Sequence, residues 1–211
     1  MYRIIRVVMK HFISILLISC VFTTGIHAQD FKRHEIAFYL STGDAANEDF
    51  GNFIYDVEQK TGYERDFLCG VDIYSVLGFE YFYNFTRKWS VGLSVGFGKT
   101  SEGLDNFSME PELRSWTDAH SRLFYVMPEV RSRWYQTQNG LFSVYSKIAL
   151  GYAHQHNWLD SNSAFDEKKN VISYQVTVGG IEFGSKRWPH LYSELGYGHQ
   201  GIFIIGIKLG L

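Results

Sequence analysis

The sequence predicts an all-β fold, an eight-stranded antiparallel up-and-down β-barrel. Three observations favour it: eight short segments alternate apolar and polar side chains, one face of each segment carries the large apolar groups, and the connections alternate between long and short. The composition agrees, because 17% aromatic residues and 20 glycines with only 3 prolines suit short strands and tight turns better than packed helices.

The chain opens with a segment that we expect to be removed. Three basic residues precede an apolar run over 12–22, and the small residue Ala28 ends the segment. This is the layout of a secretory signal peptide, so we expect 1–28 to be the leader and 29–211 the barrel domain. The sequence around Cys20 also resembles a lipobox, in which case Cys20 would carry lipid and begin the mature protein.

Charge and cysteine content exclude several classes of protein. The leader holds three of the 20 basic residues and none of the 22 acidic ones, so the rest of the chain has a formal charge of −5. That balance lacks the basic footprint of a nucleic-acid-binding protein. Cys69 is the single cysteine after the leader, so an intramolecular disulfide cannot form.

Alternation is clearest over 89–98, where Trp89, Val91 and Leu93 share one face while serines and glycines share the other. Seven other segments follow the same rule to different degrees. The eight predicted strands are His34–Thr42, Leu77–Asn84, Trp89–Gly98, Phe124–Arg131, Phe142–Tyr152, Val171–Phe183, His190–Gly198 and Phe203–Leu211.

The distribution of side-chain size over the two faces predicts where the strands lie. A soluble barrel needs an apolar interior, whereas these segments place Gly, Ser and charges on the inner face and large apolar groups outside. Segments of about ten tilted residues also match a bilayer, so we expect a transmembrane barrel. Two irregularities predict β-bulges, one at Pro128 and one near Gly179 and Gly180, where the alternation changes phase.

Connection lengths predict the orientation of the barrel. Aromatic residues such as Trp89, Trp134 and Trp188 flank the short connections, as in an interfacial girdle, so we assign the short connections and both termini to the periplasm. The long connections are 43–73, 100–121 and 155–170, and the short ones are 85–88, 135–140 and 184–189, followed by 198–201.

Three blocks carry a resemblance to a known class: GFEYFYNFTRKWSVGLSVGFGK, GIEFGSK and YSELGYGHQGIFIIGIKLGL. With the eight-strand spacing, they resemble the small outer-membrane β-barrel proteins of Bacteroidetes-type bacteria, similar to the OmpA and OmpW barrels. The resemblance implies a bacterial outer-membrane location, with outer-membrane lipid, lipopolysaccharide and the assembly machinery as partners. Such barrels often end in an aromatic residue, whereas this chain ends in Leu211.

Charged residues on the inner face predict a plugged lumen. An eight-stranded barrel is only wide enough for its own side chains, so these charges should pair across the interior and leave a structural or surface-interaction role to the loops. The aromatic connection 43–73 should cap the barrel or touch an extracellular or envelope partner. The predicted lumen network is Glu80, Glu129, Arg131, Arg133, Lys147, Glu194 and Lys208.

Two other functions stay open at this point. A membrane-embedded lipid A hydrolase or acyltransferase would need a hydroxyl, a histidine and an acid, for which His120 with Ser121, or His190 with Ser193 and Glu194, are the candidates. A secreted lipocalin-like carrier of small hydrophobic ligands would also be an eight-stranded barrel. We identify no catalytic residue from a motif, and no cofactor is expected because phosphate-binding and dinucleotide fingerprints are absent from the sequence.

His154 and His156 form a weak candidate metal site. They lie two residues apart, so a strand would place both imidazoles on one face, with Asp160 and Asp166 close by in the following connection. The sequence does not identify a physiological role, a ligand or an oligomeric state.

Overall fold

A computed structural model describes residues 33–42, 44–65, 75–105, 116–138, 140–161, 163–184 and 189–211. The predicted leader, Cys20, Cys69 and Trp188 lie outside these residues. In chain order the elements are β1 (His34–Thr42), α2 (Asp44–Thr61), β2 (Glu64–Arg65), β3 (Ser75–Asn84), β4 (Trp89–Asp105), β5 (Trp116–Gln136), β6 (Phe142–Leu159), the 3-10 helix η2 (Ser163–Phe165), β7 (Asp166–Phe183), β8 (His190–Gly198) and β9 (Phe203–Gly210).

Eight of the strands close into a barrel, which confirms the predicted fold class. The ring runs from β1 through β3, β4, β5, β6, β7, β8 and β9 and returns to β1, with every pair antiparallel. Ile36 of β1 lies opposite Tyr81 of β3 on one side and opposite Leu209 of β9 on the other. The Leu211 amide donates to the His34 carbonyl at 2.7 Å, so β1 begins and β9 ends at the same end of the barrel.

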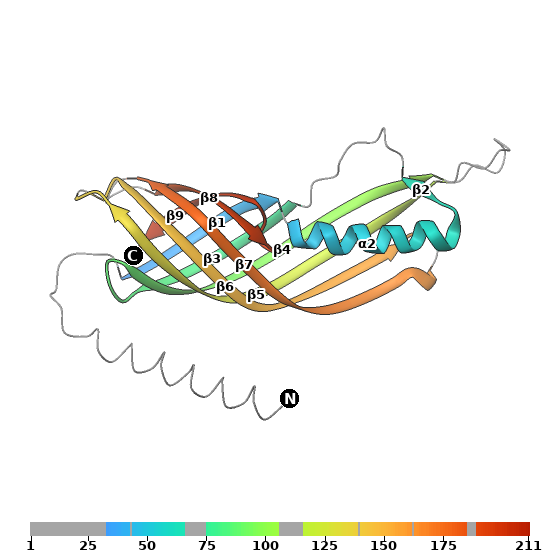
Figure 1. Cartoon of the computed structure of the whole chain (residues 1–211), viewed down its shortest axis with the longest axis horizontal. Helices are drawn as coiled ribbons and strands as arrows, with labels where there is room; N and C mark the ends of the chain where they lie inside the picture. Colours follow the sequence, from blue (N-terminus) through green and yellow to red (C-terminus); the bar gives the residue numbers. More distant parts are fainter. Residues whose placement is uncertain are drawn as a thin grey trace, which may run out of the picture.

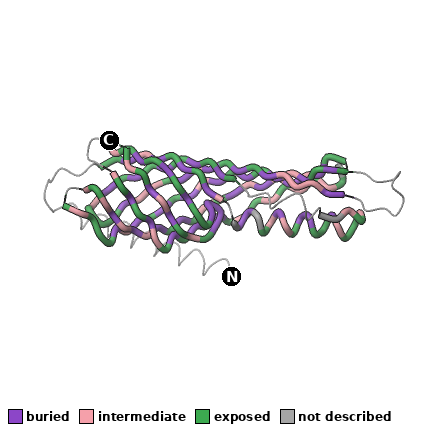
Figure 2. The backbone as a smooth tube through the Cα atoms, turned by 90° about the horizontal axis from the view of Figure 1, so that it is seen from above, coloured by how far each residue is buried: buried purple, intermediate pink, exposed green. Residues whose placement is uncertain are grey.

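The alternation of buried and exposed residues follows the predicted faces. Leu77 of β3 and Ile148 of β6 are 60% and 63% exposed, whereas Glu80 and Arg131 are fully buried. Figure 2 shows this alternation along the strands as successive buried and exposed stretches of the tube. The barrel therefore has an apolar exterior and a polar interior.

One of the two predicted bulges is confirmed and the other is wrong. Thr177 pairs with Gly196 and Gly179 with Leu195, so β7 carries one extra residue where its alternation changes phase. The pairing of β5 keeps its register past Pro128 on both sides, because a ladder can skip a hydrogen bond without gaining a residue. The register of β5 shifts instead between Arg133 and Tyr135, next to the turn into β6.

Four strands continue well beyond the barrel. β4, β5, β6 and β7 have between 17 and 21 residues, whereas β1, β3, β8 and β9 have between 8 and 10. Figure 1 shows the long strands extending past the barrel as a projecting sheet, with α2 lying along it. The predicted loops 100–121 and 155–170 are therefore corrected: residues 100–105, 116–121, 155–159 and 166–170 belong to strands, whose polar residues on both faces had hidden the alternation.

The helix α2 was not predicted, although its signal is present in the sequence. Phe50, Phe53, Ile54 and Val57 recur at helical spacing, and all four pack into one apolar cluster with Leu104, Ala119 and Leu159 of the projecting sheet. The helix ends before Gly62, whose φ of 75° favours glycine and whose amide donates to the Glu58 carbonyl at 3.1 Å. Among the described residues, no helix is both long and apolar enough to cross a bilayer.

Candidate functional site

The barrel exterior is a belt of exposed, large apolar side chains contributed by every strand of the ring. A soluble monomer rarely exposes a contiguous apolar surface above a few hundred Å². A closed barrel satisfies every backbone hydrogen bond without water, so it can lie in hydrocarbon, and barrels of the bacterial outer membrane combine an even number of antiparallel strands with an outward-facing apolar band. The belt includes Phe38, Leu77, Leu93, Phe97, Phe124, Ile148, Leu150, Val176, Leu191, Leu195, Ile205 and Ile207.

All seven predicted lumen residues are buried inside the ring. Two further acids join them, Glu35 of β1 and Glu182 of β7. Glu182 was not predicted to face the lumen because it follows the β7 bulge. The extra residue there changes which of two successive side chains points inward. Glu35 lies in the first segment, where the alternation is weak. Together the nine residues form two clusters along the barrel axis.

The first cluster lies near the end where the chain termini meet. Arg131 ion-pairs with Glu35, and its Nη1 lies 3.3 Å from Glu182 Oε1. Arg133 Nη2 lies 3.2 Å from Glu35 Oε1, and Lys208 ion-pairs with Glu182. The Arg131 guanidinium also lies 4.0 Å from the centre of the Phe82 ring, a cation–π distance. Three cations and two carboxylates therefore form ion pairs with one another across the lumen.

The second cluster lies deeper in the barrel and has the opposite balance of charge. The Lys147 ammonium lies 2.8 Å from Glu194 Oε2 and 3.6 Å from Glu129 Oε2, and it also binds Glu80. Tyr145 donates to Glu194 at 2.7 Å. Both carboxylate oxygens of Glu129 are buried without a hydrogen-bond partner in the described part of the chain. One cation thus serves three carboxylates.

A layer of hydrogen-bonded side chains lies next to the second cluster. Gln200 Nε2 donates to Ser94 Oγ at 2.7 Å and to Glu80 at 3.2 Å, and the hydroxyls of Tyr39 and Tyr125 bond to each other. These side chains come from five different strands or turns, so the interior is filled with groups that bind one another. A lipocalin-like carrier instead needs an apolar lumen with room for a ligand.

The two mouths of the barrel differ. At the end of the termini, a cavity of about 630 Å³ reaches inward to Glu35, Arg133 and Glu182. At the other end, Ala46 in the first turn of α2 is fully buried among barrel residues, and its carbonyl accepts a hydrogen bond from Gln155 Nε2 at 3.4 Å. The start of α2 therefore covers the mouth from which the sheet projects.

The structure does not bring His154 and His156 to a common centre. His154 Nδ1 lies 2.7 Å from Asn170 Oδ1, and His156 Nε2 lies 2.9 Å from Asp166 Oδ1, so each ring has its own partner on β7. Asp160, which the sequence placed beside this pair, lies next to His120 instead.

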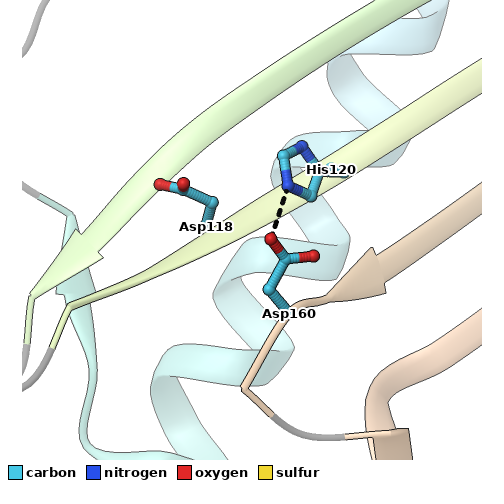
Figure 3. Close-up of side chains that lie close together, drawn as sticks. All are labelled: Asp118, His120 and Asp160. Carbon is cyan, nitrogen blue, oxygen red and sulfur yellow. Dashed lines mark hydrogen bonds and ion pairs between the residues drawn. The ribbon is translucent and has the colours of Figure 1, made fainter.

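A different histidine sits between carboxylates at the far end of the projecting sheet. Figure 3 shows Asp118, His120 and Asp160 lying close together, with His120 directed at Asp160, and His120 Nε2 lies 3.1 Å from Asp160 Oδ2. One ligand atom from each residue lies within 4.8 Å of the others. Imidazole and carboxylate are ligands that suit a divalent ion such as Zn²⁺ or Mn²⁺, so these three residues could hold one.

The candidate hydrolase residues are separated by strand geometry. Successive side chains of a strand point to opposite faces. Ser121 points into the sheet interior and donates to Asn157 Oδ1 at 2.5 Å, whereas His120 lies on the outer face. Glu194 likewise points into the lumen while Ser193, its neighbour, points out. Neither set forms a hydroxyl–histidine–acid arrangement.

Comparisons with known proteins bear on the fold alone. No family model matches the chain, and no curated protein matches it. Among solved structures it resembles Ail, the attachment invasion locus protein of Yersinia pestis, with a TM-score of 0.44 and 14% identity over 85% of this chain and 100% of that chain. It also resembles the N-terminal β-barrel domain of Pseudomonas aeruginosa OprF, with a TM-score of 0.43 and 11% identity over 84% and 95%. The barrel architecture itself follows from the closed strand order described above.

Proposed function

We propose that this chain is an outer-membrane barrel with a closed lumen, which acts at the cell surface through the projecting sheet and α2. The observation that carries the proposal is the filling of the barrel by paired charges beneath a mouth covered by Ala46. A channel needs a continuous polar path that is wide enough for water and ions. Here the inner-face charges bind one another, and charge pairs in a low-dielectric interior separate only at high cost.

The surface role rests on the size of the projecting part. Such an extension is not needed to cross a bilayer, since strands of about ten residues suffice. The outer side of α2 exposes polar residues and Tyr55, which is 58% exposed, over a helix that is firmly anchored to the sheet below. A rigid scaffold that presents an exposed helix suits contact with an extracellular or envelope protein.

Conductance measurements test the closed lumen. We expect the purified protein, inserted into planar lipid bilayers, to give no steady conductance in concentrated salt, while a known porin inserted in the same way conducts. A steady conductance from the folded barrel would contradict the closed lumen.

Site-specific labelling of intact cells tests the orientation. In a Cys69→Ser background, we expect Tyr55→Cys to react with a membrane-impermeant maleimide and Lys88→Cys, at the turn near the termini, to react only after the outer membrane is opened. Labelling of Lys88→Cys alone in intact cells would reverse the proposed topology. Absence of both variants from the outer-membrane fraction would contradict the location.

The proposal includes removal of residues 1–28 and insertion of 29–211 by the outer-membrane assembly machinery. The mass of the protein purified from membranes should correspond to a chain that begins at Gln29. A lipidated chain that begins at Cys20 would show that the alternative processing site is used.

A further inference from the structure

Four basic side chains form one row across the outer face of the long strands. Lys99 of β4 lies opposite Arg122 of β5, Arg122 lies opposite His156 of β6, and His156 lies opposite Lys168 of β7. All four side chains point to the outside of the sheet, and we call these four residues the basic row. Ser75, the first residue of β3, also pairs with Lys99, so the row stands at the level where the shorter strands of the ring begin and end.

The basic row marks the border of the apolar belt on the side of the projecting sheet. Two residues nearer the barrel centre, Phe97 lies opposite Phe124, and the two rings are 51% and 45% exposed. Two further residues inward, Val95 lies opposite Val126. On β4 and β5 the exterior therefore changes, over two residues, from groups that suit hydrocarbon to groups that suit a headgroup region, whereas β6 and β7 carry His154 and Asn170 at the level of Phe124. In the orientation proposed above, this border lies in the outer leaflet.

The row carries more positive charge than the neighbouring protein neutralises. Asp166 lies 2.9 Å from His156 and 3.9 Å from Lys168, so this carboxylate contacts both side chains. Lys99 and Arg122 have no carboxylate partner among the described residues, and Arg122 lies 5.0 Å above the Trp158 ring. Like charges directly opposite each other across strands are destabilising, and a bound anion would offset the repulsion. The row is therefore arranged to receive an anion.

A shallow cavity joins the row to the belt. It has a volume of about 210 Å³ and is lined by Phe97, Arg122, Leu123, Phe124, His154 and His156. The aromatic rings suit an acyl chain, and the guanidinium suits a phosphate, which it can bind through two parallel N–H···O bonds. We propose that the basic row and this cavity bind the phosphate group of a phosphorylated glycolipid in the outer leaflet, an inference that rests on the proposed membrane location.

Binding of purified lipid A tests this site. The full-length protein, extracted from membranes into a phosphate-free maltoside detergent, would be mixed with diphosphorylated lipid A, and bound lipid would be quantified by native mass spectrometry. We expect the double variant Lys99→Gln and Arg122→Gln to bind about tenfold more weakly or worse, since each lost contact is a charge-assisted hydrogen bond.

The chain offers a matched control at its other end. Arg87→Gln with Lys88→Gln removes the same two residue types from the exposed turn after β3, and we expect lipid A binding within about twofold of the wild type. Chemically dephosphorylated lipid A should bind the wild type as weakly as diphosphorylated lipid A binds the row variant. Millimolar inorganic phosphate should not displace the lipid.

Three results would overturn the inference: equal binding by the row variant and the wild type, equal loss in the control variant, or binding of inorganic phosphate as tight as that of lipid A, which would make this a site for free phosphate. The heat-dependent gel mobility of each variant reports folding independently. A wild-type chain that is missing from the outer-membrane fraction would defeat the proposed location instead, and the two failures are therefore distinguishable.

Discussion

Strands β4, β5, β6 and β7 run through both the barrel and the sheet that projects from it, but the two parts place their polar side chains on opposite faces. In the barrel part of β5, Arg131 points inward and is fully buried, while Val130 points outward and is 37% exposed. In the projecting part of β5, the inward residue is the buried Ala119, and the outward residues are His120 and Asp118. The strand continues and every second side chain still points inward. The difference in side-chain type is therefore explained by the surroundings, which are lipid around the barrel in the proposed location and water around the projecting sheet.

This difference determines what stabilises each part. The projecting sheet buries apolar side chains against α2, as a soluble domain does. The barrel exterior is exposed and faces lipid in the proposed location, so the barrel gains little from burial of this surface by neighbouring protein. Its interior depends on enclosed ion pairs and hydrogen bonds. Substitutions of the same kind should therefore change stability by different amounts in the two parts.

The largest effect is expected from removal of the single cation of the second lumen cluster. Lys147→Ala leaves Glu80, Glu129 and Glu194 buried without their counter-charge, which should lower the free energy of unfolding by about 3–5 kcal/mol. Urea titration followed by heat-dependent gel mobility measures it. Lys88→Ala, at an exposed turn, is the control and should change stability by less than about 0.5 kcal/mol. Equal stability of both variants would show that the lumen charges do not stabilise the barrel.

A lysine on the outer face should have a different effect in the two parts of β5. Val130→Lys places a charge in the apolar belt and should cost about 2–4 kcal/mol if the site lies near the bilayer centre. Asp118→Lys, on the same face of the projecting sheet, should cost less than about 0.5 kcal/mol because the residue is exposed to water. Refolding into lipid vesicles under urea gives both values, and equal costs would contradict the change of solvent along the strand.

Truncation of a buried residue of α2 should affect the projecting part alone. Ile54 is fully buried against the sheet, and Ile54→Ala should cost about 2–4 kcal/mol within that cluster. We expect faster proteolysis and hydrogen exchange in α2 with unchanged gel mobility of the barrel. Tyr55→Ala, on the exposed side of the same turn, should change neither. Loss of barrel mobility in the Ile54 variant would show that the two parts unfold together.

The same contrast explains how far the sequence could predict this structure. In the belt, alternation of large apolar with small or charged residues was strong enough to predict the fold class, the inward phase of Glu129 and Arg131, and the bulge near Gly179. Beyond the belt, both faces of the long strands carry polar residues, so period-two alternation fades and the strands were mistaken for loops. The apolar residues of α2 have a clear helical spacing. An all-β barrel is not expected to contain such a helix, so the segment was predicted to be a connection.

Pairing within the candidate sites was less predictable for a geometric reason. Strand phase decides which residues enter the lumen, but the stagger between strands decides which charges meet, and stagger cannot be read from one segment at a time. Glu35 and Glu182 share Arg131 although they are far apart in sequence. The same stagger brings Asp160 to His120 rather than to His156, the partner that proximity in sequence favoured.

The smallest effect is expected where the lumen holds more carboxylates than it can pair. Glu129→Gln removes a carboxyl group whose oxygens accept no hydrogen bond within the described residues and which lies beside two other acids, Glu80 and Glu194, around Lys147. Its amide also adds two donors beside these acids. We expect stability within about 1 kcal/mol of the wild type, or higher, by the same urea titration. Glu194→Gln is the comparison, because it weakens the 2.8 Å contact with Lys147, and it should be clearly destabilising. If the two variants lost equal stability, Glu129 would be as tightly bound as Glu194, and the excess of negative charge in the second cluster would have to be neutralised in another way.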